Sequence, residues 1–241
     1  TVGASEIASL LGLNPYKSII ELYFEKVGAK PVPDFDNAAM FWGRELEEQV
    51  AQKWQYWDGS VEGMIENFKA ENIIRKCRRI NSYCQNIAFP YIFVSLDRVI
   101  NKGKSNKEGS LECKTISGFS ANMWESGIPP MYVVQLQTQI GVFEFDYGEI
   151  ALLEDGRGYE VFPFDEHTAI QENIIREGKK FFDIVKEGAK EFLLHTYCPD
   201  DSLKQIHYSN CENLAPEPDG SVAYQDYLSN RYKATGTEIE G

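Results

Sequence analysis

Apolar and charged side chains alternate along GSLECKTIS, the segment of residues 109–117. Successive side chains of a β-strand point to opposite faces, so Leu111 and Cys113 are expected to share one face. Glu112 and Lys114 then share the other face. The first face can pack against a core. The second places an acid beside a base, which fits either a solvated edge strand or a site where chemistry takes place.

The preceding segment IFVSLDRVI, residues 92–100, also predicts a strand, and the polar run NKGKSNKEG between the two segments predicts a hairpin loop. The two strands are then antiparallel neighbours. With a loop of this length, Asp97 falls close to Glu112 on the paired strand. The hairpin therefore predicts two neighbouring carboxylates, with Lys114 two residues beyond the second.

The remaining periodicity predicts further helices and strands. Helices are expected over residues 5–11, 18–27, 36–57, 131–143 and 166–194, and strands over residues 72–80, 92–100, 110–117, 148–153 and 158–164. This order predicts an α/β fold with a central mixed β-sheet flanked by helices and with a helical N-terminal part. We expect one domain over residues 1–194 and an irregular C-terminal extension, rich in Asp, Asn, Ser and Gly, over residues 195–241.

One glutamate of the long helix over residues 36–57 is expected to face the core. Glu47 continues the apolar stripe that includes Val50 and Trp54, whereas the neighbouring glutamates share their faces with glutamines. An unpaired buried carboxylate costs several kcal/mol, so Glu47 needs a partner. A metal ion is one such partner. The alternative is a side chain that reaches from the edge of the stripe into solvent.

Carboxylates gathered in this way suit Mg²⁺, which prefers one or two carboxylates together with water and phosphate oxygens. Glu47, Asp97 and Glu112 supply the carboxylates, and the backbone carbonyl of Cys113 supplies a further ligand. Such an ion lowers the pKa of a bound water and offsets charge on a phosphodiester under attack. Lys114 can orient that water or stabilise the developing charge. We therefore expect a Mg²⁺ site, with Mn²⁺ as the alternative ion.

The composition bears on partners and compartment. The net charge of −13 argues against nucleic acid, although metal-binding carboxylates contribute to it and local basic segments can still line a channel. Two such segments are RKCRR at residues 75–79, for which a solvated strand is the simpler interpretation, and the lysines Lys102, Lys104 and Lys107. Five cysteines without a CxxC pair favour a reducing cytoplasm, and the lack of a run of eighteen apolar residues argues against a membrane span.

Two polar positions outside the hairpin are further candidates. Ser5 opens the first expected helix, where its hydroxyl and the free N–H groups of the helix terminus can hold an anion; a plain N-cap is the simpler interpretation. On the helix over residues 131–143, a polar stripe of Tyr132, Gln135 and Gln139 runs beside the apolar one. Gln135 can then lie near the metal, with a surface glutamine as the alternative.

The spacing of Asp97 and Glu112-Cys113-Lys114 resembles the D…(D/E)xK signature of the PD-(D/E)xK nuclease superfamily. Four further stretches, in the order of the family, resemble the YqaJ-type viral recombinase nucleases, which are similar to phage lambda exonuclease. These stretches are TVGASEIASLLGLNPYKSIIELYFEKVG at the start, FWGRELEEQV with Gly43, Leu46 and Glu47 of a G-x-x-L-E element, VSLDRVI with Asp97, and IPPMYVVQLQTQIGVF with Tyr132, Gln135 and Gln137 of a Y-x-x-Q-x-Q element. The chain departs from the family where Glu48 replaces a frequent proline.

The resemblance implies a restriction-endonuclease-like core and a metal-dependent DNA exonuclease that resects duplex ends from 5′ to 3′ in phage-type homologous recombination. It further implies a single-strand annealing recombinase as a partner and a ring-shaped homo-oligomer. The alternatives are a structure-specific endonuclease on the same fold and a non-catalytic DNA-binding protein. The roles that the resemblance implies are catalysis and metal binding for Glu47, Asp97, Glu112 and Lys114, support of the site for Gln135, and contact with a DNA phosphate for Ser5.

Two His/Cys pairs near the end of the chain raise the question of zinc. His195 with Cys198, and His207 with Cys211, are residue types that tetrahedral Zn²⁺ accepts. Their spacing is irregular and their flanks are ordinary polar loop, so we do not expect a zinc site there.

Overall fold

The computed structural model describes residues 1–29, 36–101, 107–117, 124, 127–197 and 214–216 of the 241 residues. The helices are η1 (Ala4–Glu6, a 3₁₀ helix), α1 (Ile7–Leu10), α2 (Ile19–Val27), α3 (Ala38–Trp54), α4 (Val61–Lys69), α5 (Pro130–Phe143) and α6 (Thr168–Tyr197). The strands are β1 (Val2–Gly3), β2 (Cys77–Arg78), β3 (Ile92–Phe93), β4 (Arg98–Asn101), β5 (Glu108–Ile116), β6 (Tyr147–Glu154) and β7 (Gly158–Asp165).

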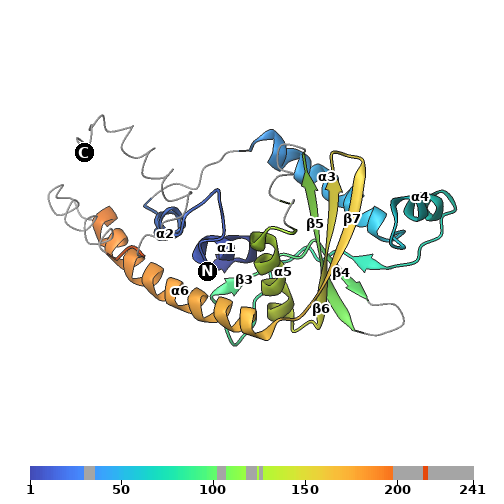
Figure 1. Ribbon diagram of the computed structural model, residues 1–241. Coiled ribbons are helices and arrows are strands. Elements are labelled where there is room, and N and C mark those ends of the chain that lie inside the picture. The colour runs from blue at the N-terminus through green and yellow to red at the C-terminus, as the bar shows by residue number, and fades with distance from the viewer. Residues whose placement is uncertain (30–35, 102–106, 118–123, 125–126, 198–213, 217–241) are drawn as a thin grey trace.

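Five strands form one mixed sheet in the order β2-β4-β5-β6-β7. The β5-β6 pair is parallel and the other three pairs are antiparallel. A separate parallel pair joins β1 and β3. Helix α3 packs on one face of the larger sheet and α5 on the other, with α1, α2 and α6 beyond α5 (Figure 1). The structure thus confirms the expected mixed sheet flanked by helices, with a helical N-terminal part.

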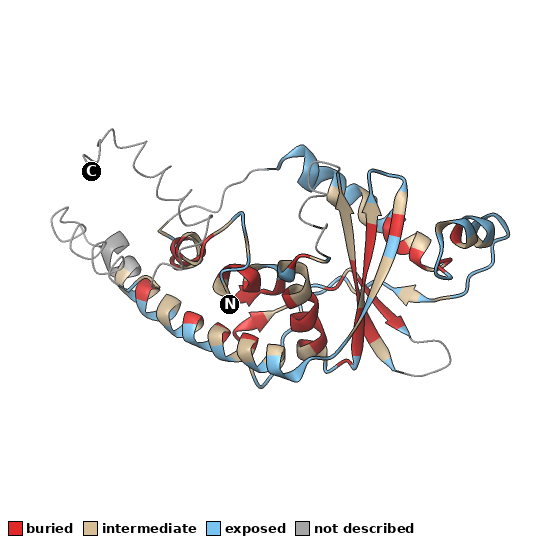
Figure 2. Cartoon of the chain, in the orientation of Figure 1, coloured by how far each residue is buried: buried red, intermediate tan, exposed pale blue. Residues whose placement is uncertain are grey.

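The two faces of the sheet carry separate cores, because side chains alternate along each strand. Val99 of β4 and Ile150 of β6 are buried in the core that contains α1, α2 and α5. Their neighbours Ile100 and Ala151 are buried in the core beneath α3. Figure 2 shows the buried residues concentrated on the central strands and on α1 and α5, whereas the first half of α3 is mostly exposed.

Helix α2 follows the sequence prediction closely. The Ser18 hydroxyl accepts the backbone N–H of Glu21 at 3.3 Å, so Ser18 is the N-cap. Gly28 ends the helix with a φ of 86°, a left-handed conformation that glycine adopts without a steric penalty. The predicted helix over residues 18–27 is confirmed.

Two of the predicted strands are shorter than expected. Only Cys77–Arg78 forms a strand within residues 72–80, and the strand expected over residues 92–100 is divided into β3 and β4. The division arises because the chain changes partner: β3 pairs with β1, and β4 pairs with β5. Asp97 consequently lies in a bend directly before β4 and not inside a strand.

The first helix begins differently from the prediction. Gly3, not Ser5, is the N-cap, and the carboxylate of Glu6 accepts the backbone N–H of Gly3 at 2.8 Å. Ser5 lies within η1 with an exposed side chain. The prediction of Ser5 as the residue that opens the helix is therefore wrong, because the carboxylate three residues beyond Gly3 satisfies the helix terminus instead.

Helix α4 was not expected from the sequence. Its N-cap is Ser60, whose hydroxyl accepts the N–H of Gly63 at 3.1 Å, and Met64 anchors it in the core beneath α3. Within the described ranges, no helix combines the length and the apolar character needed to cross a bilayer.

Helix α6 continues to Tyr197, so the boundary that we predict at residue 194 falls inside a helix. His195 belongs to this helix. Most of the predicted C-terminal extension lies outside the described residues, as do Lys102, Lys104, Cys198, His207 and Cys211.

Candidate active site

A buried carboxylate, that of Glu112 on β5, lies at the centre of the candidate site. The residue is 3% exposed. One of its oxygens accepts hydrogen bonds from the Lys114 ammonium, at 2.6 Å, and from the Gln135 amide; the other accepts the Gln139 amide at 2.6 Å. An ammonium and two amides thus compensate the burial of this charge. The predicted alternation is confirmed, because Glu112 and Lys114 face α5 while Leu111 and Cys113 pack beneath α3.

Helix α5 supplies both amides. Gln135 and Gln139 are four residues apart, so they lie on one face of the helix, here the face toward β5. Gln139 has no exposed surface, and its amide oxygen accepts the Ser110 hydroxyl at 2.6 Å. Sequence reasoning proposed Gln135 for the site but left Gln139 as a member of the polar stripe. The spacing of four was the available signal for Gln139.

Asp97 lies next to Glu112, as the hairpin predicts. Arg98 pairs with Leu111 in the β4-β5 register, which brings the preceding Asp97 beside Glu112. The Cys113 backbone N–H donates to Oδ2 of Asp97 at 2.7 Å. Burial, and next the charge of Glu112, raise the pKa of Asp97 well above its usual value, while the Cys113 hydrogen bond opposes the rise.

Lys114 is held as a cation. Burial alone lowers the pKa of its ammonium, but the charge and hydrogen bond of Glu112 outweigh burial, so the pKa is raised. The ammonium also lies 4.9 Å from the centre of the Tyr132 ring, on which the ring of Trp124 stacks. The lysine is therefore charged at neutral pH and fixed next to both carboxylates.

A second cation, Arg98, joins the sheet to α3. Its guanidinium donates to Glu47 at 2.8 Å, to Glu48 at 2.6 Å, and to the backbone carbonyl of Asp97. The side chain is 4% exposed. Sequence reasoning did not single out Arg98, because an arginine within an apolar strand gives no sign of which carboxylates it will meet.

Glu47 has a protein partner, Arg98, which the sequence did not indicate. Its carboxylate is partly buried and paired with Arg98. Glu48, expected on a solvated surface, is mostly exposed and yet pairs with the same guanidinium. The chain therefore uses the residue at the family's proline position to fix Arg98 from a second side.

Glu47 and Asp97 line one cleft of about 210 Å³. Its other lining residues are Arg79, Ile80, Asn81, Ser82, Tyr83, Ser95 and Leu96. The arginines of the basic run at residues 75–79 have different partners. Arg79 lines this cleft. Arg75 pairs with Glu149 at 2.9 Å, and Arg78 pairs with Glu108 at 2.8 Å.

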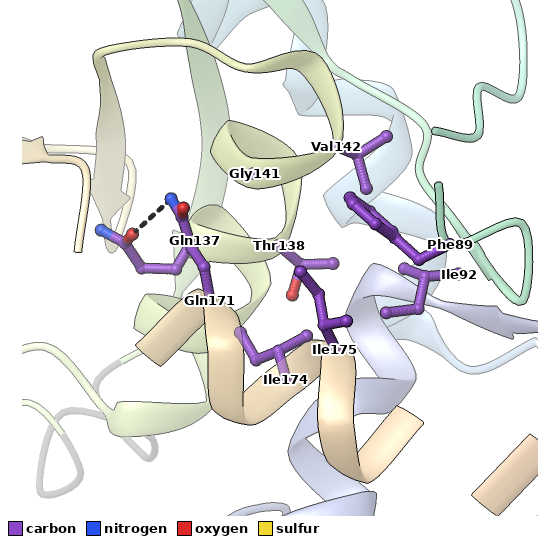
Figure 3. Close-up of a pocket in the computed structure, with 9 residues that line it drawn as sticks. All are labelled: Phe89, Ile92, Gln137, Thr138, Gly141, Val142, Gln171, Ile174 and Ile175. Carbon is purple, nitrogen blue, oxygen red and sulfur yellow. Dashed lines mark hydrogen bonds between the residues drawn. The ribbon is translucent and has the colours of Figure 1, made fainter. Parts of the chain in front are cut away.

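Two other residues from the sequence analysis lie away from Glu112. Gln137 donates to the carbonyl of Asp165 and accepts the N–H of His167, and Figure 3 shows it beside Gln171 in a pocket between α5 and α6. Gln137 therefore connects α5 to the start of α6. Ser5 lies on the exposed side of η1, a segment that packs against α5.

The residues present fit a divalent cation. Asp97 and Glu112 are adjacent carboxylates whose negative charges repel each other. In the described part of the chain, Oδ1 of Asp97 accepts no hydrogen bond. A cation between them would relieve the repulsion that raises the pKa of Asp97. Among the described residues, no three His, Cys, Asp or Glu side chains form a group that could hold a metal ion. Further ligands would come from the backbone carbonyl of Cys113 and from water.

The sequence and fold have known relatives. Residues 1–146 match the family model of the YqaJ-like viral recombinase domain. The YqaJ protein of Bacillus subtilis (strain 168) is 27% identical to this chain over 244 residues, which cover 97% of this chain and 61% of that protein. The chain thus spans less than two thirds of the length of this relative.

Solved structures share the arrangement of sheet and helices. The alkaline exonuclease LHK-Exo from Laribacter hongkongensis has a TM-score of 0.58 at 17% identity over 87% of this chain and 94% of its own, and its complex with dAMP has a TM-score of 0.59 at 18% identity over 81% and 92%. A phage-related exonuclease from Haemophilus somnus 129PT has a TM-score of 0.51 at 13% identity over 78% and 95%. The family model covers more than half of this chain, which therefore belongs to the YqaJ-like viral recombinase domain family.

Proposed function

We propose that this chain is a metal-dependent exonuclease that resects the ends of double-stranded DNA. The observation that carries the proposal is the juxtaposition of Asp97 with the hydrogen-bonded pair of Glu112 and Lys114, brought about by the antiparallel pair β4-β5. Hydrolysis of a phosphodiester needs an activated water and compensation for negative charge, and acids beside a charged lysine meet both needs. The exonucleases of the same fold, one of them bound to dAMP, support DNA as the substrate.

Asp97, Glu112 and the backbone carbonyl of Cys113 would hold Mg²⁺ or Mn²⁺, and Glu47 lines the same cleft as Asp97. When bound, the ion would lower the pKa of water and offset charge on the scissile phosphate. Lys114 orients the attacking water or stabilises the charge that develops on the phosphate. Gln135, which donates to the same oxygen of Glu112 as Lys114 does, fixes the direction of that carboxylate.

The wider role follows from the family. We propose 5′-to-3′ digestion in phage-type homologous recombination, in the cytoplasm of a bacterium or of a phage-infected host cell. The single strand left by resection would pass to a single-strand annealing recombinase, and the exonuclease itself would assemble as a ring. Ser5 is our candidate for contact with a DNA phosphate, because its exposed hydroxyl lies on the segment η1 beside α5.

The test is digestion of a linear duplex that is labelled at one end and carries either a 5′-phosphate or a 5′-hydroxyl. We expect progressive loss of nucleotides from the 5′ end with Mg²⁺ or Mn²⁺, and no digestion in EDTA. Ca²⁺, which accepts looser geometry, should maintain DNA binding without turnover. A supercoiled plasmid is the control, and it should stay intact.

Three other outcomes would change the assignment. Linearisation of the plasmid would identify an endonuclease. Binding of the duplex without digestion under any metal would identify a non-catalytic DNA-binding protein. Full digestion in EDTA would rule out the metal site.

A further inference from the structure

The cleft beside Asp97 has a second wall, which the proposed function does not use. This wall is the segment 79–83, whose side chains include a guanidinium, an amide, a hydroxyl and a phenol ring. The same cleft is also lined by Glu47 and Asp97. Because the chain has a net charge of −13, an anionic ligand needs a cation at its binding site. Arg79 supplies that cation in the segment 79–83.

Arg79 differs from Arg98, although both guanidinium groups lie near the same carboxylates. Arg98 is buried and makes hydrogen bonds of 2.6 and 2.8 Å. Arg79 is 54% exposed, and its nitrogens lie 3.7 Å from Glu47 and 3.9 Å from Glu48, beyond hydrogen-bond distance. Such exposed pairs are weak. Arg79 is therefore kept at the cleft by charge, while its N–H groups can still bind a ligand.

Tyr83 presents an aromatic ring at the same wall. The residue is 80% exposed, and its ring contacts the Phe93 ring edge to face, with 5.5 Å between centroids. Phe93 belongs to β3, so an ordered element supports the exposed ring. An exposed aromatic ring held in this way is suited to stacking on a nucleobase. Asn81 and Ser82, between the cation and the ring, can donate hydrogen bonds to phosphate or sugar oxygens.

We propose that residues 79–83 form a nucleotide subsite for a DNA strand. Arg79 binds a backbone phosphate next to the scissile one, and Tyr83 stacks on a base of the same strand. The inference rests on the proposed function, because it places this nucleotide beside Asp97. A forked guanidinium recognises phosphate, and the ring recognises any base, so the subsite binds without sequence preference.

The phosphate contact is tested by the affinity of the full chain for a fluorescent 20-base-pair duplex in Ca²⁺. We expect Arg79→Ala to weaken binding about tenfold, and Arg79→Gln to do the same. The slope of log affinity against log salt should fall by about 0.7–0.9, the value of one phosphate contact. Arg176→Ala removes an arginine of similar exposure from α6 and should change neither quantity.

The stacking contact is tested with Tyr83. Tyr83→Ala should weaken binding about tenfold, whereas Tyr83→Phe should bind as the parent does, because the ring is retained. Abasic nucleotides placed one at a time along the strand should reveal one position at which the loss of a base weakens binding by the parent. The Tyr83→Ala variant should bind DNA that is abasic at that position with the same affinity as it binds the intact duplex.

The outcomes separate the subsite from the proposed function. If the parent binds and digests the duplex, and Arg79→Ala and Tyr83→Ala bind with the parental affinity, the subsite is refuted and the exonuclease remains. If the parent neither binds nor digests the duplex, both proposals are wrong. Thermal unfolding of each variant shows whether a loss of affinity reflects a loss of folded protein.

Discussion

The Arg98 guanidinium contacts oxygens of three residues, namely Glu47 and Glu48 on α3 and the backbone carbonyl of Asp97, which directly precedes β4. Its removal takes the hydrogen-bonded cation from the partly buried carboxylate of Glu47 and leaves the exposed Arg79 guanidinium 3.7 Å away. We therefore expect Arg98→Met to lower the free energy of unfolding by about 3–5 kcal/mol, measured by urea denaturation. The size of this loss in the free energy of unfolding depends on how deeply the ion pair is buried and not on the number of ion pairs that Arg98 makes.

The matched control is Arg78, an arginine on β2, the strand that pairs with β4. It pairs with Glu108 at 2.8 Å, but both side chains are exposed. Arg78→Ala should change the free energy of unfolding by less than about 1 kcal/mol. Equal losses from the two variants would contradict the role assigned to Arg98.

Asp97 makes the stability of the metal-free protein depend on pH. Because burial and Glu112 raise its pKa, the folded state keeps a proton that the unfolded state has already released. Stability therefore falls as pH rises from about 4, the pKa in the unfolded chain, through the raised pKa. In Asp97→Asn an amide oxygen can still accept the Cys113 N–H, and this pH dependence is removed.

In EDTA at pH 7.5 we expect Asp97→Asn to unfold at a higher temperature than the parent, by about 2–4 °C for each kcal/mol gained. The difference should shrink as the pH approaches 4. Asp183→Asn, which alters an exposed carboxylate on α6, should show no such pH-dependent gain. An Asp97→Asn variant that is less stable than the parent at pH 7.5 would show that burial and Glu112 do not destabilise the charged carboxylate of Asp97.

At the residue level, local pattern predicts only part of the site. The alternation of Glu112 and Lys114, and the hairpin that brings Asp97 to them, follow from a period of two and a loop length. The roles of Arg98 and Gln139 do not follow, because their partners come from elements far along the chain. A buried polar side chain becomes recognisable only when the element that faces it is known.

Among the elements, α6 depends on a close approach to α2. A Cβ at Gly188 would lie 2.1 Å from the Tyr23 hydroxyl and 3.0 Å from Val27. Alanine favours a helix by up to about 1 kcal/mol over glycine, but this steric conflict outweighs that gain. We expect Gly188→Ala to lower the free energy of unfolding by about 1–3 kcal/mol in urea denaturation.

Gly43 on α3 provides the opposite case. Among the described residues, a Cβ there would meet only the Thr115 hydroxyl, at 3.8 Å, an ordinary contact. Gly43→Ala should therefore stabilise the protein by up to about 1 kcal/mol through helix preference alone. A gain of stability in Gly188→Ala as well would show that α6 does not pack tightly on α2.

The elements themselves were predicted where local signals were strong. Ser18 and Gly28 bound α2, and Leu111 and Cys113 alternate with Glu112 and Lys114 along β5. The division of residues 92–100 was missed, because β3 pairs with β1 near the start of the sequence whereas β4 pairs with β5, the next strand along the chain. No local pattern reports such a change of partner. Helix α4 was missed although its local signals are present: Ser60 is a favourable N-cap, and Val61, Met64, Ile65 and Phe68 are spaced as one face of a helix.

For the whole molecule, the sheet determines which residues can act together. Glu112 faces α5 and is held by its amides, whereas Arg98 faces α3 and holds the backbone carbonyl of Asp97, so the site is supported from both sides of one sheet. The two cores fix α3 and α5 independently. The family match covers residues 1–146, which include every side chain of this arrangement.

The central claim is that Asp97, Glu112 and Lys114 carry the hydrolysis of DNA. It is tested most directly by the initial rate at which Lys114→Ala and Asp97→Asn release nucleotides from a linear duplex in Mg²⁺. We predict that each variant loses activity by at least about a hundredfold, while Lys179→Ala, which removes an exposed lysine from α6, digests at the parental rate. Parental digestion by folded Lys114→Ala protein would contradict the claim.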